Sequence, residues 1–174
     1  ALSIPSLGSS DQRLFFPEDI NEVVERLLQQ IRDHHFAKHL KLQCKPTTAL
    51  KEVYINRQVI IRTLTNLLAL MIEAGWQEDI LELTLNIKDT YGSHLFYAID
   101  IECSHQRTCQ FGSIIQAVID KGITDETPVL LASIVHGVDV HGGRLVVPKR
   151  SGDSCVIRLL LAKHPDRTRI SQNT

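Results

Sequence analysis

The chain has 174 residues, of which 43% are hydrophobic and 22% charged, so it is long enough for one globular domain with a sizeable core. Its 19 Lys and Arg residues nearly balance its 20 Asp and Glu residues, with no block of like charges, which excludes a nucleic-acid footprint and a polybasic membrane patch. No apolar run approaches the roughly 20 residues of a membrane span, so we expect a cytoplasmic chain without direct membrane contact, and four cysteines are too few for a disulfide scaffold.

The first third of the chain predicts a linker, one helix and two short strands. Residues 1–13 are rich in Ser and Gly, and we expect them to link a preceding segment to the domain. The segment Pro17-Glu18-Asp19 suits the opening of a helix, and the apolar stripe that follows predicts a helix to about His35. Apolar and polar residues then alternate over 40–45 and 53–55, which predicts strands.

Residues 57–75, RQVIIRTLTNLLALMIEAG, organise the rest of the domain. Their apolar residues recur at i, i+1, i+4 and i+5, which predicts a helix with a broad apolar face that ends at Gly75. Residues 81–87 and 95–103 follow with strict alternation and predict a hairpin with one wet face and one face toward the helices. This helix and this hairpin form the predicted core.

Two further helices are predicted after a polar break at residues 104–110. The first is short and runs from Ile114 to about Gly122. The second is opened by Thr127 as its cap and Pro128 at its first position, and Gly142 or Gly143 closes it.

Two strands, 145–147 and 155–161, joined by a turn at 150–153, complete the predicted domain of residues 14–162, and a flexible polar tail follows from 163 to 174. The order of elements predicts an α/β fold, a two-layer sandwich with helices on one face of a mixed β-sheet.

Three segments carry a resemblance to a known family. They are FPEDI at 16–20, TNLLAL at 65–70 and VDVHGGRL at 138–145. In this order they resemble the domain entry, the N box and the end of the last helix in the ATP-binding domain of sensor histidine kinases, which has the Bergerat (GHKL) fold. The resemblance spans residues 14–162 and implies the same fold here.

The positions that would hold the nucleotide depart from the family pattern. The resemblance places Asn66 at the first N-box position, but the second, whose amide oxygen would help hold magnesium, is Leu70. A leucine has no oxygen for a hard cation. The family's Asp-x-Gly-x-Gly falls on Cys103, His105 and Arg107, so its carboxylate and both glycines are missing.

The last nucleotide element is also lost. Glu102 could replace the missing carboxylate only if the strand register slipped by one residue, which would turn its side chain to the other face. The family's Gly-x-Gly-Leu falls on Pro128, which has no amide hydrogen, and Leu130, which adds bulk. The loop 120–126 looks too brief for a mobile ATP lid. The resemblance therefore implies a fold kept without its cofactor and without catalytic or metal-binding residues.

Histidine and cysteine groups have alternative interpretations. His34, His35 and His39 with Cys44 could bind a metal, but we interpret the histidines as a solvated helix end near a favourable dipole. Cys103 with His105 and Cys109 could form a zinc or redox site, but the absence of a second close pair favours core and loop cysteines.

His136 and His141 could each be a phosphoacceptor, but a sensor kinase's phosphorylated histidine lies on a separate helical hairpin. We interpret His136 and His141 as a helix histidine and a C-cap histidine.

Two functions remain open. The first is a non-catalytic module of a bacterial hybrid sensor kinase or phosphorelay phosphotransfer protein, which docks a response regulator, a phosphotransfer domain or a partner kinase through Leu70, His105, Arg107 and their surroundings, while phosphotransfer chemistry lies in other domains. It could be the cytoplasmic part of a membrane-anchored sensor protein. The second is a divergent but active ATP-binding kinase domain that uses Asn66, Glu102 and Arg107. An unrelated small α/β domain with accidental similarity is a third interpretation.

Overall fold

A five-stranded mixed sheet forms one layer of the domain. The computed structural model describes residues 14–34, 40–74, 81–90, 94–103, 106–149 and 154–165, without the side chains of 34 and 106–109. The strands lie in the order β2-β4-β5-β7-β6, where β2 is Leu40–Lys45, β4 is Leu81–Asp89, β5 is Phe96–Cys103, β6 is Arg144–Val146 and β7 is Cys155–Ala162. Only β2 and β4 pair in parallel, and the other neighbours are antiparallel.

Alternation along the strands separates two faces of this sheet. In β5, Tyr97, Ile99 and Ile101 are buried in the core, and the residues between them point to the opposite side, which we call the outer face. The register that pairs Leu83 with Cys103 and Ile87 with Ile99 brings the apolar residues of β4 to the same inner face. The predicted hairpin is therefore confirmed.

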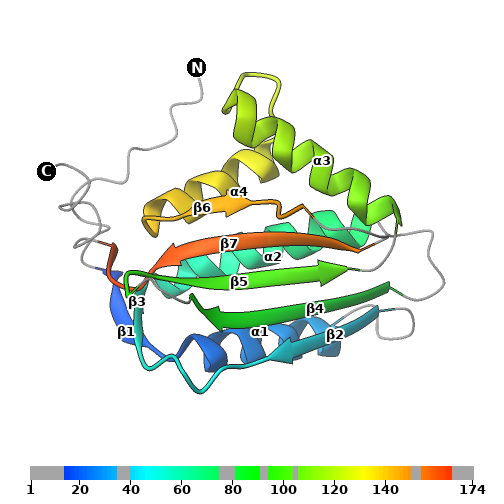
Figure 1. The fold of residues 1–174 in the computed structure, drawn as a ribbon. Helices are drawn as coiled ribbons and strands as arrows, with labels where there is room; N and C mark the ends of the chain where they lie inside the picture. The colour runs from blue at the N-terminus through cyan, green and yellow to red at the C-terminus, as the bar shows by residue number, and fades with distance from the viewer. Residues whose placement is uncertain are drawn as a thin grey trace, which may run out of the picture.

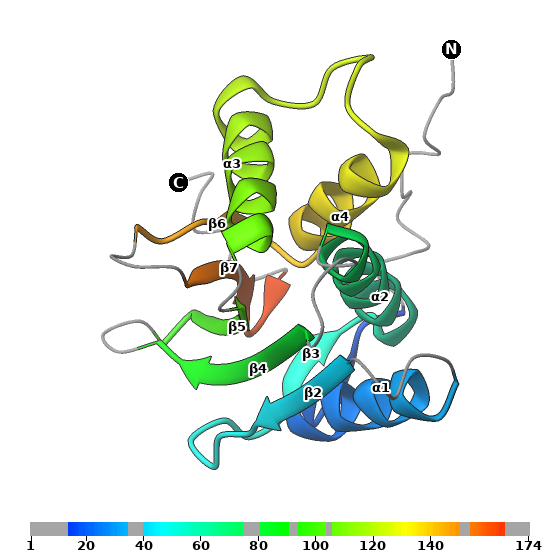
Figure 2. The ribbon, with the colours of Figure 1, turned by 90° about the vertical axis from the view of Figure 1, so that its right-hand side faces the viewer.

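Helices cover the inner face. Figures 1 and 2 show α1 (Ile20–His34), α2 (Arg57–Ala74) and α4 (Val129–Val140) stacked against one side of the sheet. The fourth helix, α3 (Gln106–Lys121), packs against β6 and β7 and against α2. The predicted α/β fold, a two-layer sandwich with helices on one face of a mixed sheet, is confirmed. None of the helices in the described part of the chain is long and apolar enough to cross a membrane.

The chain enters the domain through a two-stranded sheet, where one prediction was wrong. Pro17, predicted to open the first helix, lies in the short strand β1 (Phe16–Glu18), which pairs antiparallel with β3 (Val53–Ile55). Proline is tolerated in a strand at a sheet edge. The helix begins only at Ile20, and Asp19 caps it by accepting a hydrogen bond of 2.9 Å from the Asn21 backbone N–H.

Helix α2 has the predicted buried stripe and packs against sheet and helices. Its buried residues are Val59, Ile60, Thr63, Leu64, Leu67, Leu68 and Met71. Gly137 of α4 lies so close to α2 that a Cβ built on it would overlap the hydroxyl of Thr63. That hydroxyl donates to the Val59 carbonyl at 2.8 Å, so it is fixed in place.

The predicted glycine closure of α4 is confirmed. Gly142 adopts a φ of 66°, and its N–H donates to Asp139 O at 2.9 Å, while the Gly143 N–H donates to Val138 O at 3.1 Å. This pair of bonds is a Schellman motif. A Cβ on Gly143 would overlap the Leu160 carbonyl, so the turn after α4 lies directly against β7.

Two predicted boundaries near α3 and α4 were wrong. The expected polar break at 104–110 overlaps α3, which starts at Gln106 because Phe111 and Ile115 further along anchor the helix in the core. Thr127 does not cap α4: Pro128 occupies that position, and the Thr127 hydroxyl accepts the Thr124 N–H at 3.0 Å instead.

The described structure continues past the expected domain end at residue 162. Lys163 donates its N–H to Leu95 O at 2.8 Å, and its carbonyl accepts the Tyr54 N–H at 3.0 Å. The predicted linker 1–13, the turn at 150–153 and most of the predicted tail, from 166 to 174, lie outside the described residues.

Candidate functional site

The candidate site is formed by α2, the end of β5 and the start of α4. Helices α2 and α4 run antiparallel, because Gly137 meets Thr63 and the His141 side chain meets the Asn56 backbone. The first turn of α4 therefore lies along the C-terminal half of α2, which carries Asn66 and Leu70. The structure thus brings these predicted positions to the same region.

On α2, the two N-box positions differ in chemistry. Asn66 is half-buried. Leu70, one turn later, is partly buried and packs against the hydrophobic core. The region next to Asn66 therefore presents hydrocarbon where a second polar side chain would be needed to complete a ligand pair.

At the end of β5, Cys103 is part of the core. It is 2% exposed and pairs with Leu83 on one side and Cys155 on the other. Helix α3 closes this end of the sheet, because a Cβ on Gly112 would lie 2.8 Å from the Cys155 sulfur. Phe111 of α3 belongs to the same core cluster as Cys103.

The register slip that would rescue a carboxylate does not occur. Glu102 pairs with Thr84 and Val156, next to the Cys103 pairs, so its side chain lies on the outer face, away from α2. No described carboxylate of β5 therefore points toward the position that the nucleotide base would need.

The outer face holds a charge cluster that the sequence did not predict. Asp100 is fully buried, and its carboxylate accepts two hydrogen bonds from Arg158, at 2.8 and 3.0 Å, and one from Lys88 at 3.2 Å. The hydrogen bond to Asp100 raises the pKa of the Arg158 guanidinium. A charged residue in the middle of the apolar strand FYAIDIEC was the available signal. The cluster joins three strands and faces away from the candidate site.

The start of α4 offers little bare backbone. Pro128, its N-cap, has no N–H and makes no side-chain cap bond. Val129 is 79% exposed and Leu130 43% exposed, so hydrocarbon covers the helix start. The preceding loop is a compact turn, in which the Glu126 N–H donates to the Thr124 hydroxyl at 3.3 Å.

His141 is a structural histidine, as predicted. It is the C-cap of α4 and is fully buried. Its Nε2 accepts the Asn56 backbone N–H at 3.1 Å, so Nδ1 carries the hydrogen and donates to Gly137 O at 2.8 Å. Burial lowers the pKa of this imidazole. His136 is half-buried on the same helix.

Several predicted residues lie outside the described part of the structure. These are His35, His39 and His105, together with the side chains of His34, Arg107 and Cys109. The backbone of Arg107 belongs to the first turn of α3. Burial, followed by the negative charge of Glu25, raises the pKa of the Cys44 thiol to about 11, so this thiol is protonated at neutral pH.

Comparison with known proteins identifies the architecture. No family model and no curated protein matches the sequence. The catalytic domain of histidine kinase ThkA superposes with a TM-score of 0.65 at 16% identity, covering 88% of this chain and 98% of that domain. The fold is that of a histidine kinase catalytic domain. The histidine kinase AdeS of Acinetobacter baumannii matches with a TM-score of 0.57 at 16% identity, covering 88% of this chain and 71% of that one. The ATP-binding domain of PrrB from Mycobacterium tuberculosis matches with a TM-score of 0.55 at 16% identity, covering 85% and 96%.

ATP with magnesium, the cofactor expected of a histidine kinase fold, does not fit the described residues of this histidine-kinase-like domain. Magnesium requires oxygen ligands, but Leu70 supplies hydrocarbon. At the position where the resemblance expects a base-recognising carboxylate, Cys103 has a buried thiol, and Pro128 cannot donate a backbone N–H to a phosphate. Among the positions that the resemblance assigns to the nucleotide, Asn66 has the amide side chain that the resemblance expects.

Proposed function

We propose that this chain is a non-catalytic histidine-kinase-like domain of a two-component phosphorelay protein, and that it acts as a protein-interaction or scaffolding module. The observation that supports this most directly is that three positions which the resemblance assigns to nucleotide ligands, on three elements that meet, are apolar. Leu70 packs against the core, and Cys103 is buried in it. Pro128 precedes α4, whose first two residues, Val129 and Leu130, are apolar and exposed. A site that had lost single residues by chance while still binding nucleotide would be expected to keep more of its polar ligands.

The proposed partner is a response regulator, a phosphotransfer domain or a partner kinase. The neighbour ThkA has been solved in complex with the response regulator protein TrrA, which supports the first of these. The proposed contact surface surrounds Leu70, His105 and Arg107 and continues over the exposed Val129 and Leu130. Apolar side chains exposed beside a former ligand site suit contact with another protein.

The proposal also concerns the parent protein. A non-catalytic kinase-like domain is useful in a bacterial hybrid sensor kinase or a phosphorelay phosphotransfer protein, where another domain performs the phosphotransfer. We propose that the domain lies on the cytoplasmic side, either as the intracellular part of a membrane-anchored sensor protein or within a cytoplasmic phosphotransfer protein.

Isothermal titration with ATP and magnesium tests the loss of the cofactor. We expect no heat of binding up to millimolar ATP, because the magnesium and base ligands are missing together. The ThkA catalytic domain serves as the positive control, and the Asn66→Ala variant as the matched one, since it should change nothing in a domain that does not bind ATP.

Tight, magnesium-dependent binding that Asn66→Ala abolishes would instead establish the alternative, an active kinase domain with a divergent ligand set that includes Asn66, Glu102 and Arg107. The outer-face position of Glu102 argues against that set.

A further inference from the structure

Strand β4 extends beyond its neighbour β2. The parallel ladder between them ends where Lys45 pairs with Asn86. On its other side β4 stays paired with β5 as far as Asp89, which lies opposite Tyr97. Among the described residues, the edge of β4 from Ile87 onward therefore has no strand beside it on the β2 side.

Two features turn the chain away from β4 after β2. Pro46 has no N–H and cannot extend the ladder as a donor. Thr47 is held at the start of α1 by Asn21, whose amide nitrogen donates to Thr47 O at 2.9 Å and whose amide oxygen accepts the Thr47 N–H at 3.0 Å. The Thr47 N–H, which would reach the Ile87 carbonyl in a continued parallel ladder, is thereby used elsewhere.

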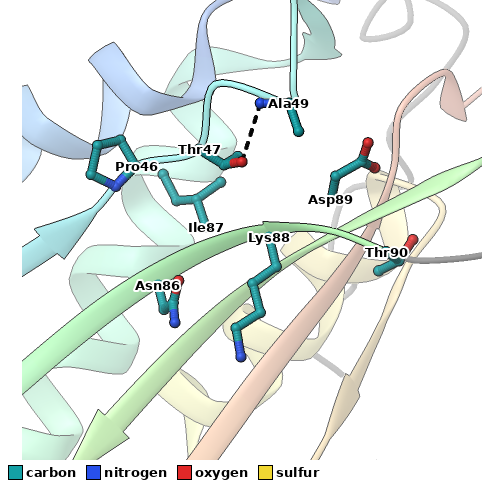
Figure 3. Close-up of a pocket in the computed structure, with 8 residues that line it drawn as sticks. All are labelled: Pro46, Thr47, Ala49, Asn86, Ile87, Lys88, Asp89 and Thr90. Carbon is teal, nitrogen blue, oxygen red and sulfur yellow. Dashed lines mark hydrogen bonds between the residues drawn. The ribbon is translucent and has the colours of Figure 1, made fainter.

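A groove of about 510 Å³ lies where the ladder stops. Figure 3 shows the loop segment from Pro46 to Ala49 on one side and β4 on the other. The lining residues are Pro46, Thr47, Ala49, Asn86, Ile87, Lys88, Asp89 and Thr90. Its volume is within the range of roughly 300 to 1,000 Å³ that is usual for binding sites.

Backbone groups of β4 point into this groove. The Lys163 N–H donates to Leu95 O at 2.8 Å. The backbone N–H and C=O groups of odd-numbered residues in β5 are therefore directed toward β7, and those of even-numbered residues toward β4. In β4, the backbone groups of Lys88, which pairs with Ala98, are directed toward β5. Those of Ile87 and Asp89 are directed toward the groove. An extended backbone is the partner that matches donors and acceptors at this spacing.

The charges around the groove are already paired. Lys88 lies 3.2 Å from the Asp100 carboxylate, and Asp89 lies 2.8 Å from the Lys163 ammonium. The exposed side chains of Pro46 and Ala49 add an apolar surface. The groove therefore favours uncharged side chains over an acidic or basic ligand.

We propose that this groove is a peptide-binding site, in which an extended, uncharged segment of a partner protein adds as a strand to the edge of β4. The edge from Ile87 to Thr90 accommodates roughly four residues, about 13 Å at the rise of a strand. The site lies at the opposite end of the hairpin from Cys103, because Cys103 pairs with Leu83 and Tyr97 with Asp89. It does not depend on the proposed loss of ATP binding.

The test is selection of displayed heptapeptides, uncharged and random in sequence, on the full chain, with counter-selection on an Ala49→Trp variant that fills the groove. We expect peptides that bind the wild type and lose at least tenfold in affinity on Ala49→Trp, while Ala49→Ser, the matched control, binds as before. Methylation of alternate peptide nitrogens should abolish binding, because it removes the ladder donors. Bound peptide should slow hydrogen exchange at the Asp89 amide.

The Asn21→Ala variant adds a check in which no residue that lines the groove is substituted. Loss of the Asn21 amide releases Thr47 and lets the loop approach β4, so the selected peptides should bind this variant more weakly. A cooperative thermal unfolding transition should show that the variant is folded. Failure to enrich any peptide over the Ala49→Trp variant, or exchange protection confined to other strands, would overturn the proposal.

Discussion

At the scale of single residues, two buried contacts fix how α2 meets α4. One is the imidazole of His141, which bridges the Asn56 N–H and the Gly137 carbonyl without access to solvent. The other is the bare Cα of Gly137, which leaves room for the Thr63 hydroxyl. The first contact depends on the protonation state of His141 and the second on the missing side chain of Gly137. A change of pH or a single substitution should therefore lower the stability of the domain.

We expect stability to fall in mild acid because of His141. Burial lowers the pKa of this group in the folded chain below its ordinary value of 6.5, so the unfolded chain takes up the proton first. The contribution is present above pH 6.5 and is lost as the pH falls toward the folded pKa. Urea unfolding at pH 7.5 and 5.0 should show this loss, and it should shrink in His141→Gln but persist in the control His94→Gln, at an exposed position. Equal pH dependence in all three proteins would refute it.

We expect Gly137→Ala to destabilise the domain by about 1 to 3 kcal/mol, because the new methyl group overlaps the Thr63 hydroxyl in a close-packed interface. Thr63→Ala removes that oxygen, so the double variant should recover part of the loss. The measurement is a double-mutant cycle by chemical denaturation. A coupling energy near zero would show that the helices separate freely at this point.

At the scale of elements, the spacing of apolar residues in the sequence predicted the helices and strands that bury one face in the core. Helix α2 and the β4–β5 hairpin were predicted because their apolar residues repeat at the helical and strand periods. The start of α3 was missed because its first residues are polar, and its anchors Phe111 and Ile115 come later. Pro17 was assigned to a helix because the same residue suits a helix start and an edge strand.

The central strands are joined by Asp100, and we expect Asp100→Ala to cost about 2 to 3 kcal/mol of stability. Removing one member of a fully buried charge pair costs roughly 3 to 5 kcal/mol, but Arg158 and Lys88 are each about a third or more exposed and regain some hydration. Lys41→Ala, which breaks the exposed pair with Glu82, is the control and should stay within about 0.5 kcal/mol of wild type. Denaturant midpoints of the three proteins provide the comparison, and similar losses in both variants would contradict the assigned role.

At the scale of the whole molecule, the fold could be predicted from the sequence, but the surroundings of the candidate site residues could not. The order of motifs predicts that Leu70 and Pro128 stand where the family has nucleotide ligands. The burial of Cys103 could not be predicted from the sequence, because it depends on how β5, β7 and α3 pack together. The groove beside β4 was also missed, since it arises from the Asn21–Thr47 pair, which joins residues far apart in the sequence.

The close contacts of α4 have a consequence for how this segment can change. Gly137 lies against α2 and Gly143 lies against β7, and each contact leaves space for hydrogen alone. An added or deleted residue between the two glycines would turn one contact about 100° away from its neighbour. Exposed positions of α4 such as Val129 can be substituted, and the buried Leu131 and Ile134 can be exchanged only for similar apolar residues, but the number of residues between the two glycines cannot change.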